Sequence, residues 1–153
     1  MDIKIFREYR LKFYLNARHY IIVGNEKSDT HPHTWELALT ILIRKKEFIK
    51  FGNFETKIEE YFSKYQDRVL NEIAPFNAII PTLENMVDYF ANDIYKIIKE
   101  VGGELVCLEG SEGPSRSYIL NLREENESMD AVDNQSENIL SDIIDTILDD
   151  IID

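Results

Sequence analysis

The stretch that decides the fold is His31-Pro32-His33-Thr34-Trp35-Glu36-Leu37. Residues 35–43 are rich in β-forming side chains and continue into Arg44-Lys45-Lys46, which predicts a strand entered from a polar loop. Successive side chains of a strand alternate between the two faces of a sheet, so we expect His31 and His33 to project to the same side. Two imidazoles on one side of a rigid strand are a simple start for a metal site.

Such a site needs a third ligand, because an open zinc site typically has three protein ligands. The remaining histidine of the chain is His19, which lies in an earlier β-like run over residues 12–23. The alternative interpretation is that His31 and His33 are surface residues flanking a proline and that His19 is a core or surface residue. Because His-x-His is common by chance, the spacing alone leaves both interpretations open.

Length and composition predict one globular domain. The chain has 153 residues, 44% of them hydrophobic, which is enough for a single apolar core. The one cysteine, Cys107, cannot form an internal disulfide, so we expect a reducing, cytoplasmic location. We expect no signal peptide and no membrane span, because no apolar run reaches the length that a bilayer requires.

The net charge of −12 comes almost entirely from the C-terminal segment. Residues 124–153 contain eleven acidic residues and no basic one, which leaves eighteen acids against seventeen bases in residues 1–123. The body of the protein is therefore nearly neutral. No basic stripe is present and the acidic segment would repel phosphate, so we expect no nucleic-acid partner.

The first half of the chain predicts two strands and a helix. The strands cover roughly residues 3–23 and 34–50 and are joined by a polar loop over 24–30. Asn53 is the predicted N-cap of the helix. Its apolar face is formed by residues spaced three and four apart, namely Phe54, Ile58, Tyr61, Phe62, Tyr65, Val69 and Leu70.

The second half predicts another helix and two more strands. The helix begins after Thr82 and ends at Gly102-Gly103. The strands cover residues 104–108 and 115–122, separated by a turn over 109–114. The order β-β-α-α-β-β predicts an α+β fold, in which a four-stranded antiparallel sheet has both helices on one face. The other face is then expected to be covered by another subunit.

The sequence resembles the tunnelling-fold family of 6-pyruvoyl-tetrahydropterin and 6-carboxytetrahydropterin synthases over residues 3–122. Leu15-Asn16-Ala17-Arg18-His19 resembles the family's Phe-x-Ala-x-His, and His31-Pro32-His33 resembles its His-Gly-His. Phe51-Gly52-Asn53-Phe54 matches the segment that opens the first helix. Pro81-Thr82-Leu83-Glu84-Asn85 is similar to the family's Pro-Thr-x-Glu-Asn, and Glu109 with Tyr118 resembles its late Glu and Tyr.

The resemblance implies zinc bound by His19, His31 and His33. It also implies trimers that close a β-barrel and stack into hexamers. The ligand would be pterin- or purine-like, and Glu109 would bind its amino-pyrimidine edge. A carboxylate suits this role because it accepts two parallel hydrogen bonds. Glu112 is the other candidate for the same role, and a solvated turn glutamate is the structural alternative for Glu109.

The family's catalytic residues are not matched. Lys27 stands four residues before His31, where the family has a cysteine, and Gln66-Asp67 stands in place of its Asp-His pair. A lysine cannot imitate a thiolate, and an amide has no proton to relay. Cys107 lies in a late apolar strand, where a thiol usually only packs. We therefore expect the usual chemistry to be absent, and if catalysis remains, Asp67, Glu26 and Lys27 are the candidate residues.

The predicted organisation is a tunnelling-fold domain over 1–123, an acidic flexible linker over 124–138, and an acidic amphipathic helix over 139–153. The helix is predicted because apolar pairs recur every four residues from Ile139 to Ile152. It could fold back on its own assembly or dock into a groove of a partner protein. Its acidic face argues against a membrane surface.

Three functions are compatible with these features. The leading prediction is a catalytically degenerate member of the family that keeps the metal and a pterin- or purine-like ligand. It would act as a sensor, regulator or adaptor through its acidic C-terminal helix. The second is an active synthase or lyase on a dihydropterin substrate, with substituted acid–base residues. The third is a structural assembly subunit without a ligand.

Overall fold

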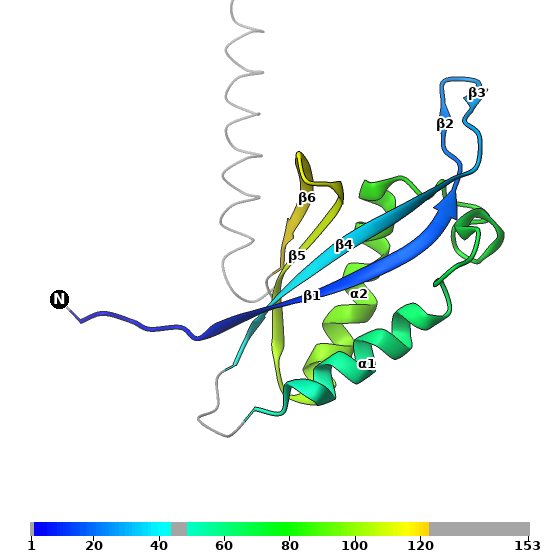
Figure 1. Ribbon diagram of the computed structural model, residues 1–153. Coiled ribbons are helices and arrows are strands. Elements are labelled where there is room, and N and C mark those ends of the chain that lie inside the picture. Colours follow the sequence, from blue (N-terminus) through cyan, green and yellow to red (C-terminus); the bar gives the residue numbers. More distant parts are fainter. Residues whose placement is uncertain (1, 44–48, 123–153) are drawn as a thin grey trace, which may run out of the picture. The chain divides into compact units, whose positions relative to one another are not determined.

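The structure is a computed structural model that describes residues 2–43 and 49–122. Four strands form an antiparallel sheet in the order β1-β4-β5-β6, and two long helices lie on the same side of it (Figure 1). The predicted α+β architecture is confirmed. The strands are β1 (Glu8–His19), β4 (His31–Leu42), β5 (Glu104–Gly113) and β6 (Arg116–Asn121), and the helices are α1 (Phe51–Ser63) and α2 (Leu83–Val101).

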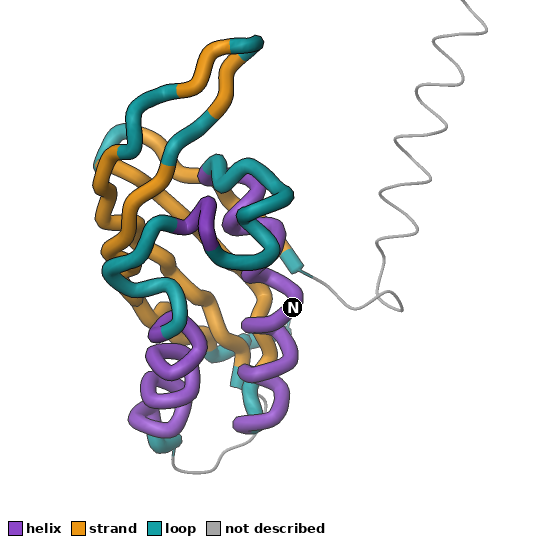
Figure 2. Tube along the Cα trace, turned by 90° about the vertical axis from the view of Figure 1, so that its right-hand side faces the viewer, coloured by secondary structure: helices purple, strands orange, loops and turns teal. Residues whose placement is uncertain are grey.

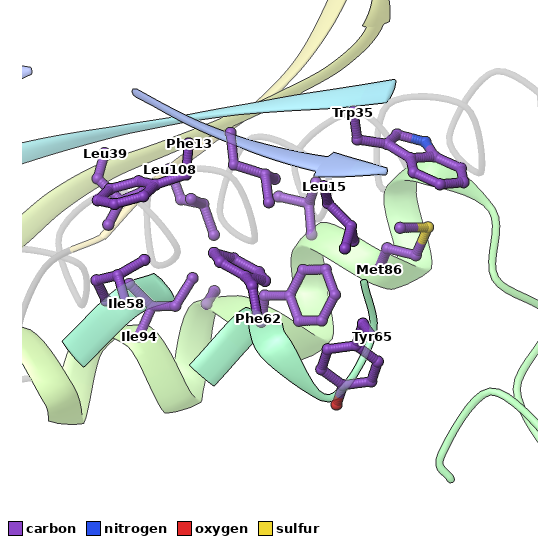
Figure 3. Packing of buried hydrophobic residues seen from close by; sticks show 14 of the residues in the cluster. Phe13, Leu15, Trp35, Leu39, Ile58, Phe62, Tyr65, Met86, Ile94 and Leu108 are labelled. Carbon is purple, nitrogen blue, oxygen red and sulfur yellow. The ribbon is translucent and has the colours of Figure 1, made fainter. Parts of the chain in front are cut away.

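The core lies between the sheet and the two helices. Along β1 the side chains from Phe13 to His19 alternate between buried and exposed, as expected of a strand with one covered face. The buried residues of the sheet point toward those of α1 and α2 (Figure 3). The two helices run beside each other along the strands (Figure 2). The helical residues buried in this core are Phe54, Ile58 and Phe62 of α1 and Met86, Val87, Phe90, Ala91, Ile94 and Ile98 of α2.

The ends of α2 are as predicted, and those of α1 are not. The Thr82 hydroxyl accepts a hydrogen bond from the Asn85 N–H, and Gly102 closes α2 in the left-handed conformation. The α1 helix begins after Lys50 without a side-chain cap, so the prediction that Asn53 is its N-cap was wrong. It also ends at Ser63. Tyr65 and Leu70 are fully buried, but from the segment that follows the helix.

The strands also differ from their predicted lengths. The run predicted over 3–23 stops at His19, and the polar loop contains a small hairpin of β2 (Ile22–Val23) and β3 (Glu26–Lys27). The predicted turn over 109–114 is mostly strand, because β5 continues to Gly113. Gly110 is a strand residue whose backbone lies against α2, where a Cβ atom would be 2.4 Å from Val87 Cγ2.

The sheet face away from the helices is more polar. Lys12 and Glu36 form an ion pair of 3.4 Å there, and Tyr14 is exposed. None of the helices in the described part of the chain is long and apolar enough to span a bilayer. The predicted linker over 124–138 and helix over 139–153 lie outside the described residues.

We expect Gly110→Ala to lower the free energy of unfolding by about 1–3 kcal/mol, because the added methyl group must push Val87 and α2 away from the sheet. Gly52→Ala is the matched control. Nothing lies within 4 Å of its Cβ position, and alanine is the better helix former, so this change should stabilise by up to about 1 kcal/mol. Urea unfolding of both variants measures the difference. Equal stability would show that β5 and α2 are less tightly packed than described.

Candidate metal centre

Three histidines meet at one end of the β1–β4 pair. His19 is the last residue of β1 and lies opposite His31, the first residue of β4, and His33 lies opposite Ala17. One ligand atom from each of the three side chains lies within 4.8 Å of the others. The antiparallel register and the alternation of side chains are therefore enough to gather all three imidazoles on one face of the sheet.

Two of the rings are fixed by backbone carbonyl groups. His19 Nδ1 lies 2.7 Å from the Pro81 carbonyl oxygen, and His31 Nδ1 lies 2.8 Å from that of Asp29. A carbonyl can only accept, so each Nδ1 carries the proton, and in the neutral ring each Nε2 presents a lone pair. This is the outer-shell arrangement typical of metal-binding histidines.

The two Nε2 atoms face each other at 3.0 Å. Two lone pairs at this distance repel unless a cation, either a proton or a metal ion, lies between them. Tetrahedral zinc with Zn–N bonds of about 2.0–2.1 Å separates its nitrogen ligands by roughly 3.3 Å, which is close to the observed spacing. The donor set therefore fits zinc.

Burial favours the neutral form of His19. It lowers the pKa of His19, and the neighbouring His31 and His33 lower it further, against the opposing hydrogen bond to the Pro81 carbonyl. A neutral imidazole is the form that binds a metal ion. The indole of Trp35 is fully buried below the cluster, with its ring 4.9 Å from that of His19 and 5.2 Å from that of His33.

A pocket of about 500 Å³ opens beside the histidines. The start of α2, the end of β5 and strand β6 line it together with the cluster. The residues it contains besides the histidines include Thr82, Glu84, Glu112, Ser115, Arg116 and Tyr118. A ligand in this pocket would lie next to a metal ion with an open coordination position.

The sequence profile described as 6-pyruvoyl tetrahydropterin synthase matches residues 8–125 of the chain. The chain belongs to this family. This confirms the resemblance inferred from the motifs. A comparison with curated proteins found no significant match.

Several solved structures share the fold. The 6-pyruvoyl tetrahydropterin synthase of Caenorhabditis elegans is 12% identical and superposes with a TM-score of 0.64, over 80% of this chain and all of that one. A catalytic-residue mutant of the Plasmodium vivax enzyme, in which a glutamate is replaced by alanine, is 14% identical with a TM-score of 0.58, over 78% of this chain and all of that one. An uncharacterised protein from Wolinella succinogenes is 9% identical, with a TM-score of 0.59 and the same coverage.

The two candidate ligand-binding glutamates lie on opposite faces of the sheet. Glu112 lines the histidine pocket, and its Oε1 accepts a hydrogen bond of 3.0 Å from Trp35 Nε1. Glu109 pairs with Ala38 and Ile119, between residues that face the helices, so its side chain is on the sheet face away from the helices. Within one subunit the structure brings Glu112 to the histidine cluster and not Glu109.

The candidate catalytic residues lie outside this pocket. Glu26 and Lys27 are on the small hairpin, and the Lys27 ammonium lies 4.0 Å from the centroid of the Tyr20 ring. Asp67 has a φ of 59° and its N–H donates to the Asn16 carbonyl oxygen. It lines a separate, more open pocket that includes His33.

Gln66 has a clear structural role. Its side-chain Nε2 donates to the Tyr14 carbonyl oxygen and its Oε1 accepts from the Asn16 N–H, both at 2.9 Å. The amide thus pairs with the free edge of β1 as a neighbouring strand would. Gln66 is therefore engaged with the β1 backbone through both the oxygen and the nitrogen of its amide.

Sequence reasoning gave three residues of this site no role. Trp35 could have been placed, because it lies two residues after His33 in a strand and therefore on the same face. Glu84 and Arg116 could not, since only the packing of α2 against the sheet and the place of β6 within it bring them to the pocket beside the histidines.

We expect the protein purified without chelator to carry one zinc ion per chain, and the His31→Ala/His33→Ala double variant to lose it, because one imidazole is not enough to hold the ion. Elemental analysis measures the content. Thr34→Ala is the control, since Thr34 lies between the two histidines but projects to the opposite face. Absence of metal from the unmodified protein, or its retention in the double variant, would contradict the assignment.

Proposed function

We propose that this protein holds one zinc ion with His19, His31 and His33 and binds a pterin- or purine-like ligand beside it, without synthase activity. It would act as a sensor, regulator or adaptor. The observation that carries the proposal is the convergence of three imidazole nitrogens, two of them on rings fixed by backbone carbonyl groups. When bound, zinc supplies a Lewis acid that polarises a ligand oxygen.

The ligand class follows from the carboxylates and from the family. The amino-pyrimidine edge of a pterin or purine presents an N–H and an amino group side by side, and a carboxylate accepts from both. Of the two candidate glutamates, Glu112 lines the histidine pocket within the subunit, with one oxygen already bonded to Trp35 Nε1. Glu109 lies on the face of the sheet away from the histidines. It can therefore bind a ligand that also contacts a metal site only if that metal site belongs to another copy of the chain.

A closed homo-oligomer, a hexamer as in the resemblance, would supply such a neighbour. The sheet ends in two edge strands, β1 and β6. Ile119 of β6 is half exposed on the sheet face away from the helices. Pairing of the two edges between copies would close the sheet into a barrel and remove both edges.

The absence of synthase activity is supported by what the replacing residues do. Lys27 lies over the Tyr20 ring, and Gln66 is bound to the edge of β1. Neither carries the thiolate or carboxylate expected at its position. The second candidate function, an active lyase, is supported by one comparison, since a glutamate is a catalytic residue in the Plasmodium vivax enzyme. The carboxylates of Glu112, Glu26 and Asp67 would then be the candidates for that role.

With dihydroneopterin triphosphate or the corresponding 6-carboxytetrahydropterin synthase substrate, we expect turnover about a hundred- to ten-thousand-fold below that of a synthase. A family enzyme assayed in parallel, such as that of Caenorhabditis elegans, is the reference. Turnover at the reference rate would establish the lyase. A native mass spectrum of the unmodified protein tests the rest, because it reports zinc, retained ligand and subunit number together. If the subunits carry zinc but bind neither pterin nor purine, even when these compounds are added, the protein would be a structural assembly subunit without a ligand.

The acidic C-terminal segment is proposed to connect the assembly to a protein partner. Its eight large apolar residues between 139 and 152 recur at helical spacing, and a helix this short is marginal in water unless that face is buried. Repulsion among its aspartates adds to the difficulty, since acids near a helix C-terminus oppose the dipole.

Deleting residues 124–153 should leave the oligomer and its zinc intact and abolish partner capture. The docking groove should carry Lys or Arg at its rim, so capture by the full chain should weaken with salt. The full and the truncated chains are compared by light scattering for assembly, by elemental analysis for zinc and by pull-down for partner capture. Loss of assembly or a clearly lower melting temperature after deletion would place the segment in the core instead.

A further inference from the structure

We propose that Glu112 is the outer-sphere partner of the metal, hydrogen-bonded to whatever donor occupies the open coordination position. This inference rests on the proposed metal site. It assigns Glu112 a role distinct from binding an amino-pyrimidine edge. It also implies that the open coordination position prefers groups that can donate a hydrogen bond, because an ionised carboxylate only accepts hydrogen bonds and carries negative charge. Water, hydroxyl and amino groups would be favoured at the metal over anions.

Alternation along β5, together with the bond to Trp35, gives the direction of Glu112. Gly110 lies opposite Leu37 and against Val87 of α2, so it faces the helices, and Ser111, opposite Glu36, faces away. The next residue, Glu112, therefore points back to the helix side, where it reaches the Trp35 indole.

The hydrogen bond to Trp35 fixes the carboxylate in place. Trp35 is fully buried and its Nε1–H has no role in the sheet ladder, so it needs an acceptor. Glu112 Oε1 supplies one, and the second carboxylate oxygen remains for another donor. An exposed glutamate would otherwise lose considerable side-chain entropy on being held in one orientation. Here that cost is offset by the bond to the buried indole.

The carboxylate acts on the cluster through space. Trp35 contacts His19 and His33, so the group that holds the indole is close to two ligands. Burial is the main influence that lowers the pKa of His19, and the charge of Glu112 is one of the influences that oppose it. The same charge would stabilise a divalent cation among the histidines.

Glu112 is assigned to the bound group and not to the metal itself. The three ligand nitrogens gather within 4.8 Å of one another, and that group does not include a carboxylate oxygen of Glu112. One of its oxygens is already engaged by Trp35. The pocket also contains Glu84 and Arg116, so the effect of Glu112 must be separated from the general charge of the pocket.

The test is a Co²⁺ titration of the full chain freed of metal. Trp35 is the only tryptophan and lies against two ligands, so its fluorescence should be quenched as Co²⁺ binds. In Glu112→Gln the amide oxygen can still accept from the indole while the charge is removed. We expect its Kd for Co²⁺ to rise about tenfold, as is usual for the loss of an outer-shell partner. Glu112→Asp, which keeps the charge on a shorter side chain, should fall in between.

Two variants with the same change of charge are the controls. Glu36→Gln changes a residue on the face of β4 opposite the histidines. Glu84→Gln changes a residue of α2 that lines the histidine pocket. Glu36→Gln should bind Co²⁺ like the unmodified protein, and Glu84→Gln should change the Kd clearly less than Glu112→Gln does. An effect of Glu84→Gln as large as that of Glu112→Gln, or no effect of either, would overturn the proposal.

The visible absorption of bound Co²⁺ provides the second measurement. An unchanged spectrum in Glu112→Gln, with tighter binding of added azide, supports a carboxylate that acts beyond the first coordination shell and disfavours anions. A spectrum that reports a changed coordination number makes Glu112 a direct ligand and overturns the proposal. Failure of the unmodified protein to bind Co²⁺ or Zn²⁺ would remove the proposed function itself, which distinguishes the two outcomes.

Discussion

The antiparallel pairing of β1 with β4 is the interaction on which both the core and the site depend. Twelve residues of each strand are matched, from Glu8 opposite Leu42 to His19 opposite His31. A slip of one residue would turn every side chain of one strand to the other face. It would expose Trp35 and Leu37 and also separate the histidines. The apolar core therefore holds the three histidines in register, and no loop has to close around them.

The sequence was most informative where a local rule and the tertiary structure agree. His31 and His33 share a face because the strand period is two. Thr82 and Gly102 bound α2 because their side-chain and backbone chemistry suits helix ends. Predictions failed where tertiary contacts override the local pattern. Tyr65 and Leu70 continue the apolar spacing of α1, yet the chain has already left the helix and buries them from a different direction.

The glycines of β5 misled the sequence interpretation for a physical reason. Gly110 and Gly113 resemble turn residues, but Gly110 is required where the strand passes close to Val87 of α2. Because β5 is extended through this stretch, its successive side chains alternate between the two faces of the sheet. Glu109 and Glu112 are three residues apart and therefore lie on opposite faces. The sequence motif could identify both glutamates as candidates. Only the observed strand register shows on which face of the sheet each of them lies. Arg116 and Glu84 were beyond prediction, because their proximity to the histidines comes from packing between elements distant in sequence.

Gln66 closes part of the free edge of β1 with its side-chain amide. The edge of β1 offers a carbonyl at Tyr14 and an N–H at Asn16, so its partner must both donate and accept. A side-chain amide does both, whereas an ionised carboxylate at this position could only accept and would face the Tyr14 carbonyl with like charge. A glutamine at this position therefore closes this part of the edge as an ionised acid could not. Among the described residues, the Glu8–Lys12 part of the edge has no backbone partner on its outer side. A second copy that adds a strand to β1 would be directed there, to the end of the strand away from the histidines.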